Sequence, residues 1–512
     1  MRNFLLFSIA FFSIIKSNSL FAQPFPLILN RENTQYYDKI LQQKNINFHT
    51  SVKPYNYHSI SNHIGSDSTL YKPRSLNILI MPVSRVMVGT DITSKRSFND
   101  ASVGFQLRAG LGQKLGLQLN YLRGQGIFPN YVDSIIRQTS VVPGMGYAWY
   151  GTQKKSYVYQ LITGSLTYSP NKIFTLEAGN GKHFWGDGYR SLFLSDNSNN
   201  YPYFKINTKV WKFNFTNLYA NLKDINSALG TPSKYTNKYM SAHLLSYNAT
   251  KWLNVGLFES IIFQNRNSDP TKFGFDVNYL NPVIFYRPVE YSLGSADNAL
   301  VGAFFKMKIF KNIQWYGQVM LDEFYLKFFK SRNGWWANKN AFQTGIKYFD
   351  AFNINGLYLQ AEANYVRPYT YTHGYTIINY GHFNQALAHP VGANFYEGIG
   401  IINYTQKRFF AELKTNYLVY GADSSGKNMG KNIFESYFSN RPRDFGNYTT
   451  QGIKTTVMMA ELRCSYLLIK SFNLKIEASY LQRMQMALSN KWNTQLFSIG
   501  FKTNFINQYL DY

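Results

Sequence analysis

The stretch Gly179–Asp196 (GNGKHFWGDGYRSLFLSD) concentrates residue types that bind ligands. Its glycines and Lys182 suggest a phosphate loop, but a Walker A motif requires Gly-x-x-x-x-Gly-Lys-Ser/Thr. Leu176 stands where the first glycine is required, and His183 follows Lys182. A dinucleotide fingerprint is excluded as well, because no βαβ pattern surrounds the stretch. Nucleotide binding is therefore not expected here.

The same residues suit a sugar ligand better. Trp185 and Tyr189 could stack on the apolar face of a sugar ring. Asp187 and Arg190 could hydrogen-bond hydroxyls, carboxylates or phosphates. The alternative is purely structural: the glycines at 186 and 188 permit positive φ, and the other residues pack the loop against the body of the protein.

Two further segments contribute candidate residues. Segment 265–298 is too apolar for a freely solvated loop, so we expect it to fold inward and constrict a pore, or to pack on its neighbours. Segment 367–395 adds basic, aromatic and histidine side chains. The candidate glycan-binding residues are Trp185, Asp187, Tyr189, Arg190, Tyr286, Arg287, Glu290, Arg367 and His373.

The sequence favours neither a metal site nor catalysis, and no cofactor is expected. Segment 196–200 (DNSNN) begins like a calcium loop but lacks the sixth-position glycine and the closing glutamate. The histidines are too scattered for an HExxH motif. Asp322 and Glu323 are adjacent on an expected strand and therefore point to opposite faces. A surface hydrolase stays an alternative, because the residues of a catalytic triad need not be close in sequence.

Alternating apolar and polar residues dominate the chain from about residue 77. In 103–111 (VGFQLRAGL) apolar residues alternate with Gly104, Gln106 and Arg108, and 115–121 (LGLQLNY) repeats the pattern after a short turn. An arginine on the polar face is costly toward lipid and natural toward a wet lumen. Counting the similar runs predicts an all-β fold: a transmembrane antiparallel β-barrel of about 18 strands. The runs are 79–91, 157–168, 173–179, 203–211, 213–222, 239–249, 253–264, 299–309, 313–324, 341–349, 356–366, 396–405, 408–420, 455–469, 473–484 and 494–506.

Short and long connections alternate between these runs, which is typical of periplasmic turns and extracellular loops in an outer-membrane barrel. The final run leads to the aromatic Tyr512, like the assembly signal of such barrels. The short turns lie near 112–114, 169–172, 250–252, 310–312, 350–355, 406–407 and 470–472. The long segments are 124–156, 180–202, 223–238, 265–298, 325–340, 367–395 and 421–454.

Three regions are expected. Residues 1–22 resemble a signal peptide, with Arg2, an apolar core at 4–15 and a cleavage site after Ala22. Residues 23–76 are polar, contain a short helix near 32–43, and form a periplasmic extension or a plug. Residues 77–512 form the barrel, so the expected location is the cell outer membrane. The single Cys464 excludes an internal disulfide.

Composition agrees with a barrel and indicates acidic partners. Aromatic residues make up 18% of the chain, yet the mean hydropathy is −0.28, because each strand of a barrel is only half lipid-facing. The net charge of +26 favours lipopolysaccharide phosphates or an acidic polysaccharide. Export from the cytoplasm argues against a nucleic-acid partner.

Several stretches together resemble the RemB gliding-motility proteins of Bacteroidota, and more distantly the Wzi capsule-assembly family. The resemblance implies an outer-membrane barrel of about 18 strands. In the Wzi family such a barrel is a surface lectin that anchors capsular polysaccharide, and RemB-like proteins are associated with surface motility and adhesin machinery. The stretches are 181–196 (GKHFWGDGYRSLFLSD), 279–290 (YLNPVIFYRPVE), 294–298 (GSADN), 321–324 (LDEF), 348–350 (YFD), 367–373 (RPYTYTH) and 380–390 (YGHFNQALAHP).

The expected function is therefore non-enzymatic: anchoring surface polysaccharide, or supporting gliding and adhesin display. The expected partners are capsular polysaccharide, outer-membrane lipid and lipopolysaccharide, and motility or secretion proteins. One alternative is a porin or transporter, because about 18 strands leave room for an aqueous channel. The other is a surface hydrolase of lipid or glycan.

Overall fold

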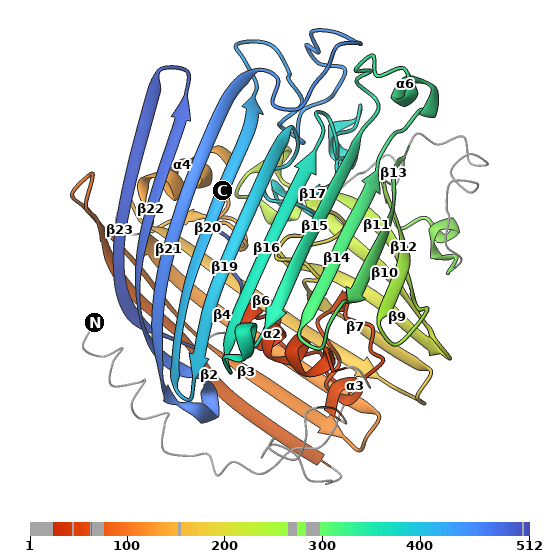
Figure 1. The fold of residues 1–512 in the computed structure, drawn as a ribbon, viewed down its shortest axis with the longest axis vertical. Coiled ribbons are helices and arrows are strands. Elements are labelled where there is room, and N and C mark those ends of the chain that lie inside the picture. Colours follow the sequence, from red (N-terminus) through yellow and green to blue (C-terminus); the bar gives the residue numbers. More distant parts are fainter. Residues whose placement is uncertain are drawn as a thin grey trace.

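The computed structural model describes residues 24–43, 46–61, 63, 76–151, 155–264, 274–282, 297–503 and 506–512. Most of them form one closed antiparallel barrel of 18 strands (Figure 1), as the alternating pattern predicts. Each wall strand pairs with the next wall strand in sequence, and β2 closes the barrel against β23 with Arg85 opposite Lys502.

The wall strands are β2 (Leu76–Asp91), β3 (Arg96–Leu111), β4 (Leu115–Ile127), β6 (Tyr157–Tyr168), β7 (Phe174–Gly181), β9 (Tyr201–Val210), β10 (Phe213–Asp224), β11 (Thr236–Asn248), β12 (Leu253–Phe263), β13 (Asn298–Lys308), β14 (Ile313–Leu321), β15 (Asn340–Phe349), β16 (Leu357–Val366), β19 (Phe395–Gln406), β20 (Phe409–Ala422), β21 (Ile453–Ile469), β22 (Leu474–Ala487) and β23 (Asn490–Thr503).

Shorter elements lie in the connections and in the N-terminal segment. The helices are α2 (Arg31–Leu41), α3 (Tyr57–Ser61), α4 (Asn130–Thr139) and α6 (Leu326–Lys330), with 3-10 turns η2 (Asn226–Ala228), η3 (Pro232–Lys234), η4 (Val277–Leu280), η5 (Ala351–Asn353), η6 (Thr376–Ile378) and η7 (Lys470–Phe472). The short strands are β1 (Val52–Lys53), β5 (Trp149–Tyr150), β8 (Phe184–Trp185), β17 (Gly381–His382) and β18 (Gln385–Ala386).

The apolar face of the strands points outward and the polar face inward. In β4, Leu117 and Leu119 are 43% and 40% exposed, whereas Gln118 and Asn120 are buried. Arg108 lies over the ring of Phe25, at 5.2 Å, and Phe25 belongs to the N-terminal segment inside the barrel. The predicted placement of this arginine toward the lumen is therefore confirmed. Exposed rings and aliphatic chains cover the outer surface, as a wall facing lipid requires.

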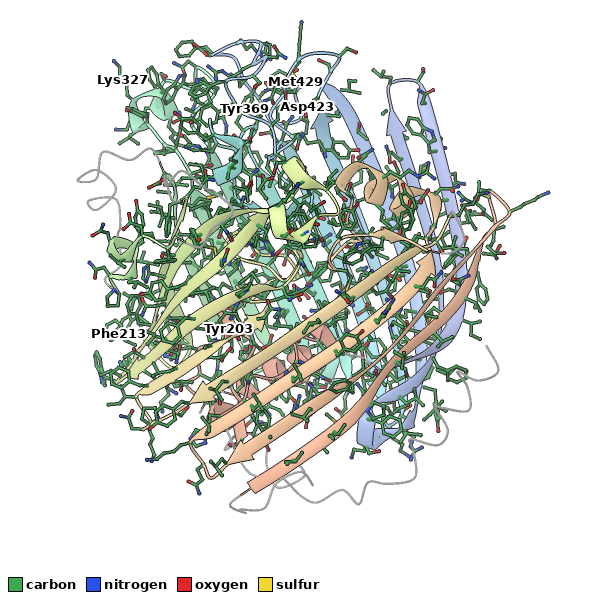
Figure 2. All side chains as sticks on the ribbon, turned by 180° about the vertical axis from the view of Figure 1, so that it is seen from behind. Tyr203, Phe213, Lys327, Tyr369, Asp423 and Met429 are labelled. Atoms are coloured by element: carbon green, nitrogen blue, oxygen red, sulfur yellow. The ribbon has the colours of Figure 1, made fainter. Side chains whose placement is uncertain are left out.

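The long and short connections lie at opposite ends of the barrel. In Figure 2, Lys327 marks the end with the long loops, and Phe213 lies toward the end with the short turns. We call these ends extracellular and periplasmic, following the rule for outer-membrane barrels. Turns 92–95 and 488–489 are short although they lie at the extracellular end. The hairpins β2–β3 and β22–β23 are neighbours in the barrel wall, because β2 pairs with β23.

Residues 24–43 and 46–61 fill the lumen, where Figure 1 shows α2 enclosed by the wall strands. The expected helix near 32–43 is confirmed as α2. Ion pairs hold α2 to the wall: Asp38 lies 2.8 Å from Lys347, Lys39 lies 2.7 Å from Asp350, and Arg31 pairs with Glu412. The N-terminal segment is thus an ordered filling of the lumen at its periplasmic side.

The end of the chain differs from the sequence-based prediction. Strand β23 ends at Thr503, and residues 506–512 turn back into the lumen, where Tyr509 is buried. Tyr131 donates a hydrogen bond to the Leu510 carbonyl at 3.1 Å, and Tyr509 donates one to Asp196 at 2.9 Å. Tyr512 therefore does not end the closing strand. The polar residues that follow β23 find more hydrogen-bond partners in the lumen than lipid would offer them.

Candidate functional site

The loop between β7 and β9, residues 182–200, enters the lumen instead of standing outside the barrel. Its strand β8 pairs with β1 of the N-terminal segment, with Trp185 opposite Val52 and Phe184 opposite Lys53. Trp185 is fully buried, and its ring packs edge-on against Phe258 of the wall. The apolar residues of this loop thus cover surface that the lumen would otherwise expose to water.

Asp187 joins this loop to the N-terminal segment. Its carboxylate accepts hydrogen bonds from Thr50 Oγ1 at 2.5 Å and Ser51 Oγ at 2.9 Å, and Lys53 Nζ lies 3.8 Å away. Burial disfavours its charge, but the surrounding cations Lys53 and Lys306 outweigh this effect and hold the Asp187 pKa below its usual value. Asp187 is a buried, fully engaged anion.

Tyr189 and Arg190 join the loop to the chain end and the wall. The backbone N–H groups of both donate to the Glu362 carboxylate, and the Tyr189 hydroxyl donates to Asp511 at 2.5 Å. Arg190 Nη2 lies 3.0 Å from carboxylate oxygens of both Glu397 and Asp511. Although burial opposes the charge, these two carboxylates hold the Arg190 pKa well above its usual value.

The glycines of this loop serve close packing more than unusual dihedral angles. Gly186 has a positive φ of 156°, as the structural alternative predicts, whereas Gly188 does not. A Cβ at Gly188 would lie 2.5 Å from Glu362 Oε2 and 2.6 Å from the Arg190 carbonyl. At Gly186 it would lie 2.6 Å from Gln318 Nε2. Glycine is needed because the loop backbone touches the inner wall.

The loop between β16 and β19 closes the extracellular side of the lumen. Arg367 is half-buried and donates to the Asn447 carbonyl at 3.4 Å. His373 is buried, its Nδ1 accepts from the Tyr375 N–H at 3.1 Å, and burial lowers its pKa to about 4. His389 Nε2 lies 2.6 Å from Glu397, in contact with the Arg190 cluster.

His382 holds three separate segments together. Its Nδ1 accepts a hydrogen bond from the Lys223 N–H at 2.9 Å, and its Nε2 lies 3.2 Å from the Asn200 carbonyl. This arrangement requires the neutral tautomer with hydrogen on Nε2. Burial, together with the nearby Lys238 and Lys223, lowers the His382 pKa to about 3. His382 therefore ties β10 and the 182–200 loop to the 367–394 loop.

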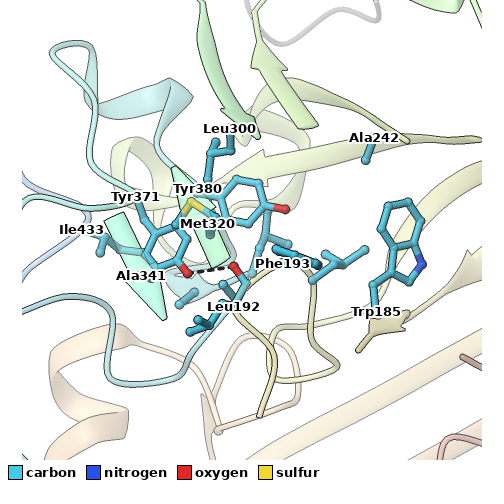
Figure 3. Packing of buried hydrophobic residues seen from close by; sticks show 14 of the residues in the cluster. Trp185, Leu192, Phe193, Ala242, Leu300, Met320, Ala341, Tyr371, Tyr380 and Ile433 are labelled. Carbon is cyan, nitrogen blue, oxygen red and sulfur yellow. Dashed lines mark hydrogen bonds between the residues drawn. The ribbon is translucent and has the colours of Figure 1, made fainter. Parts of the chain in front are cut away.

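A large apolar cluster completes the closure of the lumen. Figure 3 shows Phe193 among wall residues and Tyr371 donating to the Leu192 carbonyl, a hydrogen bond of 2.8 Å. Phe193 stacks on Phe258 with ring centroids 4.4 Å apart. Leu192 and Phe193 come from one loop and Tyr371 from another. Two loops that are far apart in sequence thus form one packed core.

Of the predicted residues, Trp185, Asp187, Tyr189 and Arg190 therefore lie in one buried assembly. In this assembly Arg190 and His389 both contact Glu397. Glycan contact by these side chains stays a prediction, and it would require the loops to leave the lumen. Tyr286, Arg287 and Glu290 lie outside the described residues. The described part of the 265–298 segment packs on neighbouring strands, with Phe275 5.1 Å from Phe263.

Sequence reasoning missed an exposed aromatic and cationic surface at the extracellular end, which we call the rim platform. It is formed by the β14–β15 and β20–β21 loops, clamped together by backbone hydrogen bonds from Trp336 N to Asp444 O (2.9 Å) and from Gly446 N to Asn333 O (2.8 Å). Its residues are Tyr325, Lys327, Phe328, Phe329, Lys330, Arg332, Trp335, Trp336, Arg441, Arg443, Phe445 and Tyr448.

Aromatic contacts bind the rim platform into one surface. Trp335 lies 4.6 Å from Phe328 and 5.1 Å from Tyr325, and Phe328 lies 5.8 Å from Phe445 of the other loop. The Arg441 guanidinium lies 3.9 Å above the Trp336 ring. In the sequence, this surface could have been found from the high density of aromatic and basic residues in 325–336 (YLKFFKSRNGWW) and 441–448 (RPRDFGNY).

The charge of the rim platform is positive. Asp444 is paired with Arg441 at 2.6 Å. Among the residues that the structure describes, the side chains of Lys327, Lys330 and Arg443 form no ion pair, and all three are exposed. Tyr325, Phe445 and Tyr448 are 61%, 48% and 59% exposed. This surface offers flat rings and free cations side by side.

Comparison with solved structures identifies the architecture. The structure is similar to Wzi of Escherichia coli, an outer-membrane protein involved in group 1 capsule assembly and a carbohydrate-binding β-barrel. The similarity has a TM-score of 0.58 at 12% identity and covers 94% of this chain and 100% of Wzi. The chain has the fold of an outer-membrane β-barrel. OccAB2 of Acinetobacter baumannii (TM-score 0.43, 11% identity, 83% of this chain and 97% of that one) and OprD of Pseudomonas aeruginosa (0.44, 8%, 84% and 96%) are similar to a lesser degree.

No protein-family model matches the sequence, and comparison with curated proteins gives no match. Within the described residues, no cluster of three or more His, Cys, Asp or Glu side chains is arranged to hold a metal ion. None of the described helices is long and apolar enough to cross a membrane.

Proposed function

We propose that this chain is a non-enzymatic surface anchor that binds polysaccharide at the extracellular end of its barrel. The observation that carries the proposal is the rim platform. Aromatic rings can stack on sugar rings, and arginine and lysine bind carboxylate or sulfate groups through charge-assisted hydrogen bonds. The resemblance to the RemB and Wzi proteins supports the same role, including support of gliding motility and adhesin display.

The packed lumen supports an anchor more than a channel. Residues 24–43, 46–61, 182–200, 367–394 and 506–512 all contribute buried contacts inside the barrel. We propose that Trp185, Asp187, Tyr189 and Arg190 act structurally by holding these segments together. The glycan contacts then come from the rim platform, with Arg367 and His373 supporting the loops beneath it.

The experiment compares glycan binding by purified, refolded barrels that differ at the platform. The test variant combines Tyr325→Ala, Phe445→Ala and Arg443→Gln. The matched control combines Tyr150→Ala, an exposed tyrosine on another loop, with Lys491→Gln and Trp492→Ala at the start of β23, where both side chains are exposed. We expect the test variant to lose at least about tenfold in affinity for acidic polysaccharide, since three contacts are removed, while the control keeps its affinity.

The same variants are then expressed in cells that lack the chromosomal gene, and capsule retention and colony spreading are scored together. We expect the test variant to fail where the control restores the wild-type phenotype. Equal glycan affinity and equal phenotypes for the two variants, at equal levels of folded barrel, would show that the rim platform does not carry the function.

A further inference from the structure

The short periplasmic turns carry cations in a nearly complete ring. Each of these turns contains at least one lysine or arginine, except the turn 350–356. Because the wall strands follow one another around the barrel, these turns are spread over its whole circumference. We call this set the turn ring: Lys114, Lys172, Lys212, Lys251, Lys311, Lys407, Arg408 and Lys470.

The turn ring is not neutralised by the protein itself. Its side chains are exposed, apart from the half-buried Lys212, which donates to the Ala249 carbonyl at 3.3 Å. Within the described ranges, no member of the ring forms an ion pair with a carboxylate. The one acidic residue in these turns, Asp350, is already paired with Lys39 of α2 at 2.7 Å. The exposed members of the ring are therefore available to an external anion.

Exposed aromatic residues accompany the cations and indicate their height in the membrane. Trp211 precedes Lys212, Trp252 follows Lys251, and Phe310 precedes Lys311; these rings are 74%, 49% and 65% exposed. Barrels place such rings in a girdle at the boundary between hydrocarbon and headgroups. Each of these rings has a lysine next to it in the sequence, in the same turn. These lysines therefore lie at the depth of the lipid phosphates.

We propose that the turn ring binds the phosphate groups of anionic phospholipids in the periplasmic leaflet around the barrel. A single docked protein would require the charge on one side, whereas the cations occupy turns all around the circumference. A leaflet surrounds the barrel in the same way. Lysine and arginine next to a membrane surface attract anionic lipid through an interaction that salt screens within a Debye length.

The experiment measures which lipid contacts the barrel. The full chain is reconstituted in phosphatidylcholine vesicles in which a fraction of the lipid is brominated phosphatidylglycerol or, separately, brominated phosphatidylcholine. Quenching of tryptophan fluorescence reports lipid next to the wall, and Trp211 and Trp252 lie beside the ring. We expect phosphatidylglycerol to be preferred at least about threefold at low salt, and the preference to fall as salt rises.

The test variant carries Lys114→Gln, Lys172→Gln, Lys251→Gln, Lys311→Gln and Lys470→Gln. The control removes the same charge from exposed lysines at the extracellular end that lie outside the rim platform: Lys95→Gln, Lys155→Gln, Lys234→Gln, Lys427→Gln and Lys491→Gln. Heat-modifiable migration in SDS gels confirms that both are folded. We expect the lipid preference to disappear in the test variant and to persist in the control.

If both variants lost the preference for phosphatidylglycerol equally, only the total charge would matter and the proposal would be overturned. It would also be overturned if the test variant kept the preference. Binding to purified peptidoglycan that the test variant loses, without any lipid preference in the wild type, would assign the ring to cell-wall carboxylates and also overturn it. None of these outcomes depends on glycan binding at the rim platform, so the two proposals fail separately.

Discussion

Arg190 and Asp511 form a fully buried ion pair in the barrel lumen, with Arg190 Nη2 3.0 Å from Asp511 Oδ1. The two residues are far apart in sequence, and their contact joins the 182–200 loop to the segment that follows the last strand. Glu397 of β19 lies on the same guanidinium at 3.0 Å. One arginine thus holds a loop, the chain end and the wall together.

Removing this arginine should destabilise the barrel strongly. Arg190→Met removes the guanidinium shared by two buried carboxylates, so that of the ion pairs that the structure describes Asp511 keeps only that with Lys414, at 3.1 Å, and Glu397 keeps only that with His389, at 2.6 Å. Removing one partner of a buried ion pair costs about 3–5 kcal/mol of unfolding free energy. Urea unfolding in lipid vesicles, followed by tryptophan fluorescence, measures this change. Arg332→Met removes an exposed arginine and is expected to change stability little. If the two variants unfolded at the same urea concentration, the buried pair would not contribute as argued.

Removing the N-terminal segment should open the lumen. Deleting residues 24–61 takes away α2 and β1, which pair with Lys347, Glu412 and Trp185. We expect larger and more frequent single-channel currents in planar bilayers, since a lumen inside 18 strands is wide enough for water. Tyr36→Ala, on an exposed position of α2, is the control and should conduct as little as the wild type. High conductance of the intact chain would instead favour a porin.

Adding one methyl group inside the lumen should disturb the same seal. At Gly188 a Cβ would meet Glu362 Oε2 at 2.5 Å and a backbone carbonyl at 2.6 Å, so Gly188→Ala forces the loop away from the wall. Overpacking of this kind costs about 1–3 kcal/mol. The matched control is Gly398→Ala in β19, where a Cβ meets nothing within 4 Å. Unfolding free energies of both variants decide whether close approach is the reason for glycine at 188.

Acid should loosen the loops through His382. Its pKa is lowered from 6.5 to about 3 by burial, so the folded state favours the neutral ring. The stability that this preference contributes is complete above pH 6.5 and is lost as the pH falls toward 3. Protonation of Nδ1 would also break the hydrogen bond from the Lys223 N–H.

Hydrogen exchange of the 367–394 loop, compared between pH 7.5 and pH 5, measures this effect. We expect faster exchange at the lower pH after correction for intrinsic rates. His382→Gln should be less protected at pH 7.5, by about 1–3 kcal/mol for the unmatched buried groups, and less sensitive to pH. His58→Gln, at a half-buried position on α3, should behave like the wild type. Equal pH sensitivity in all three proteins would assign the effect to other groups.

The strands could be predicted because their physical cause is local. A lipid-facing wall requires apolar residues at every second position, and alternation such as that of Leu117, Gln118, Leu119 and Asn120 is visible in one sequence window. Loop lengths are local as well, so the periplasmic and extracellular ends followed from counting residues. That the Gly179–Asp196 stretch has neither Walker nor dinucleotide spacing can also be read from the sequence alone.

The tertiary structure alone decided where the loops go. Trp185, Asp187 and Arg190 have residue types that suit a sugar, yet all three are buried, because Val52, Thr50 and Asp511 meet them inside the barrel. These partners are more than a hundred residues away in sequence, so no local pattern could reveal them. The rim platform arises in the same way, since Trp336 and Arg441 meet only when two loops dock. The sequence by itself was enough to predict the barrel strands and to tell the two ends of the barrel apart. Which segments fill the lumen depended on pairing of charges and apolar surfaces between residues far apart in the chain.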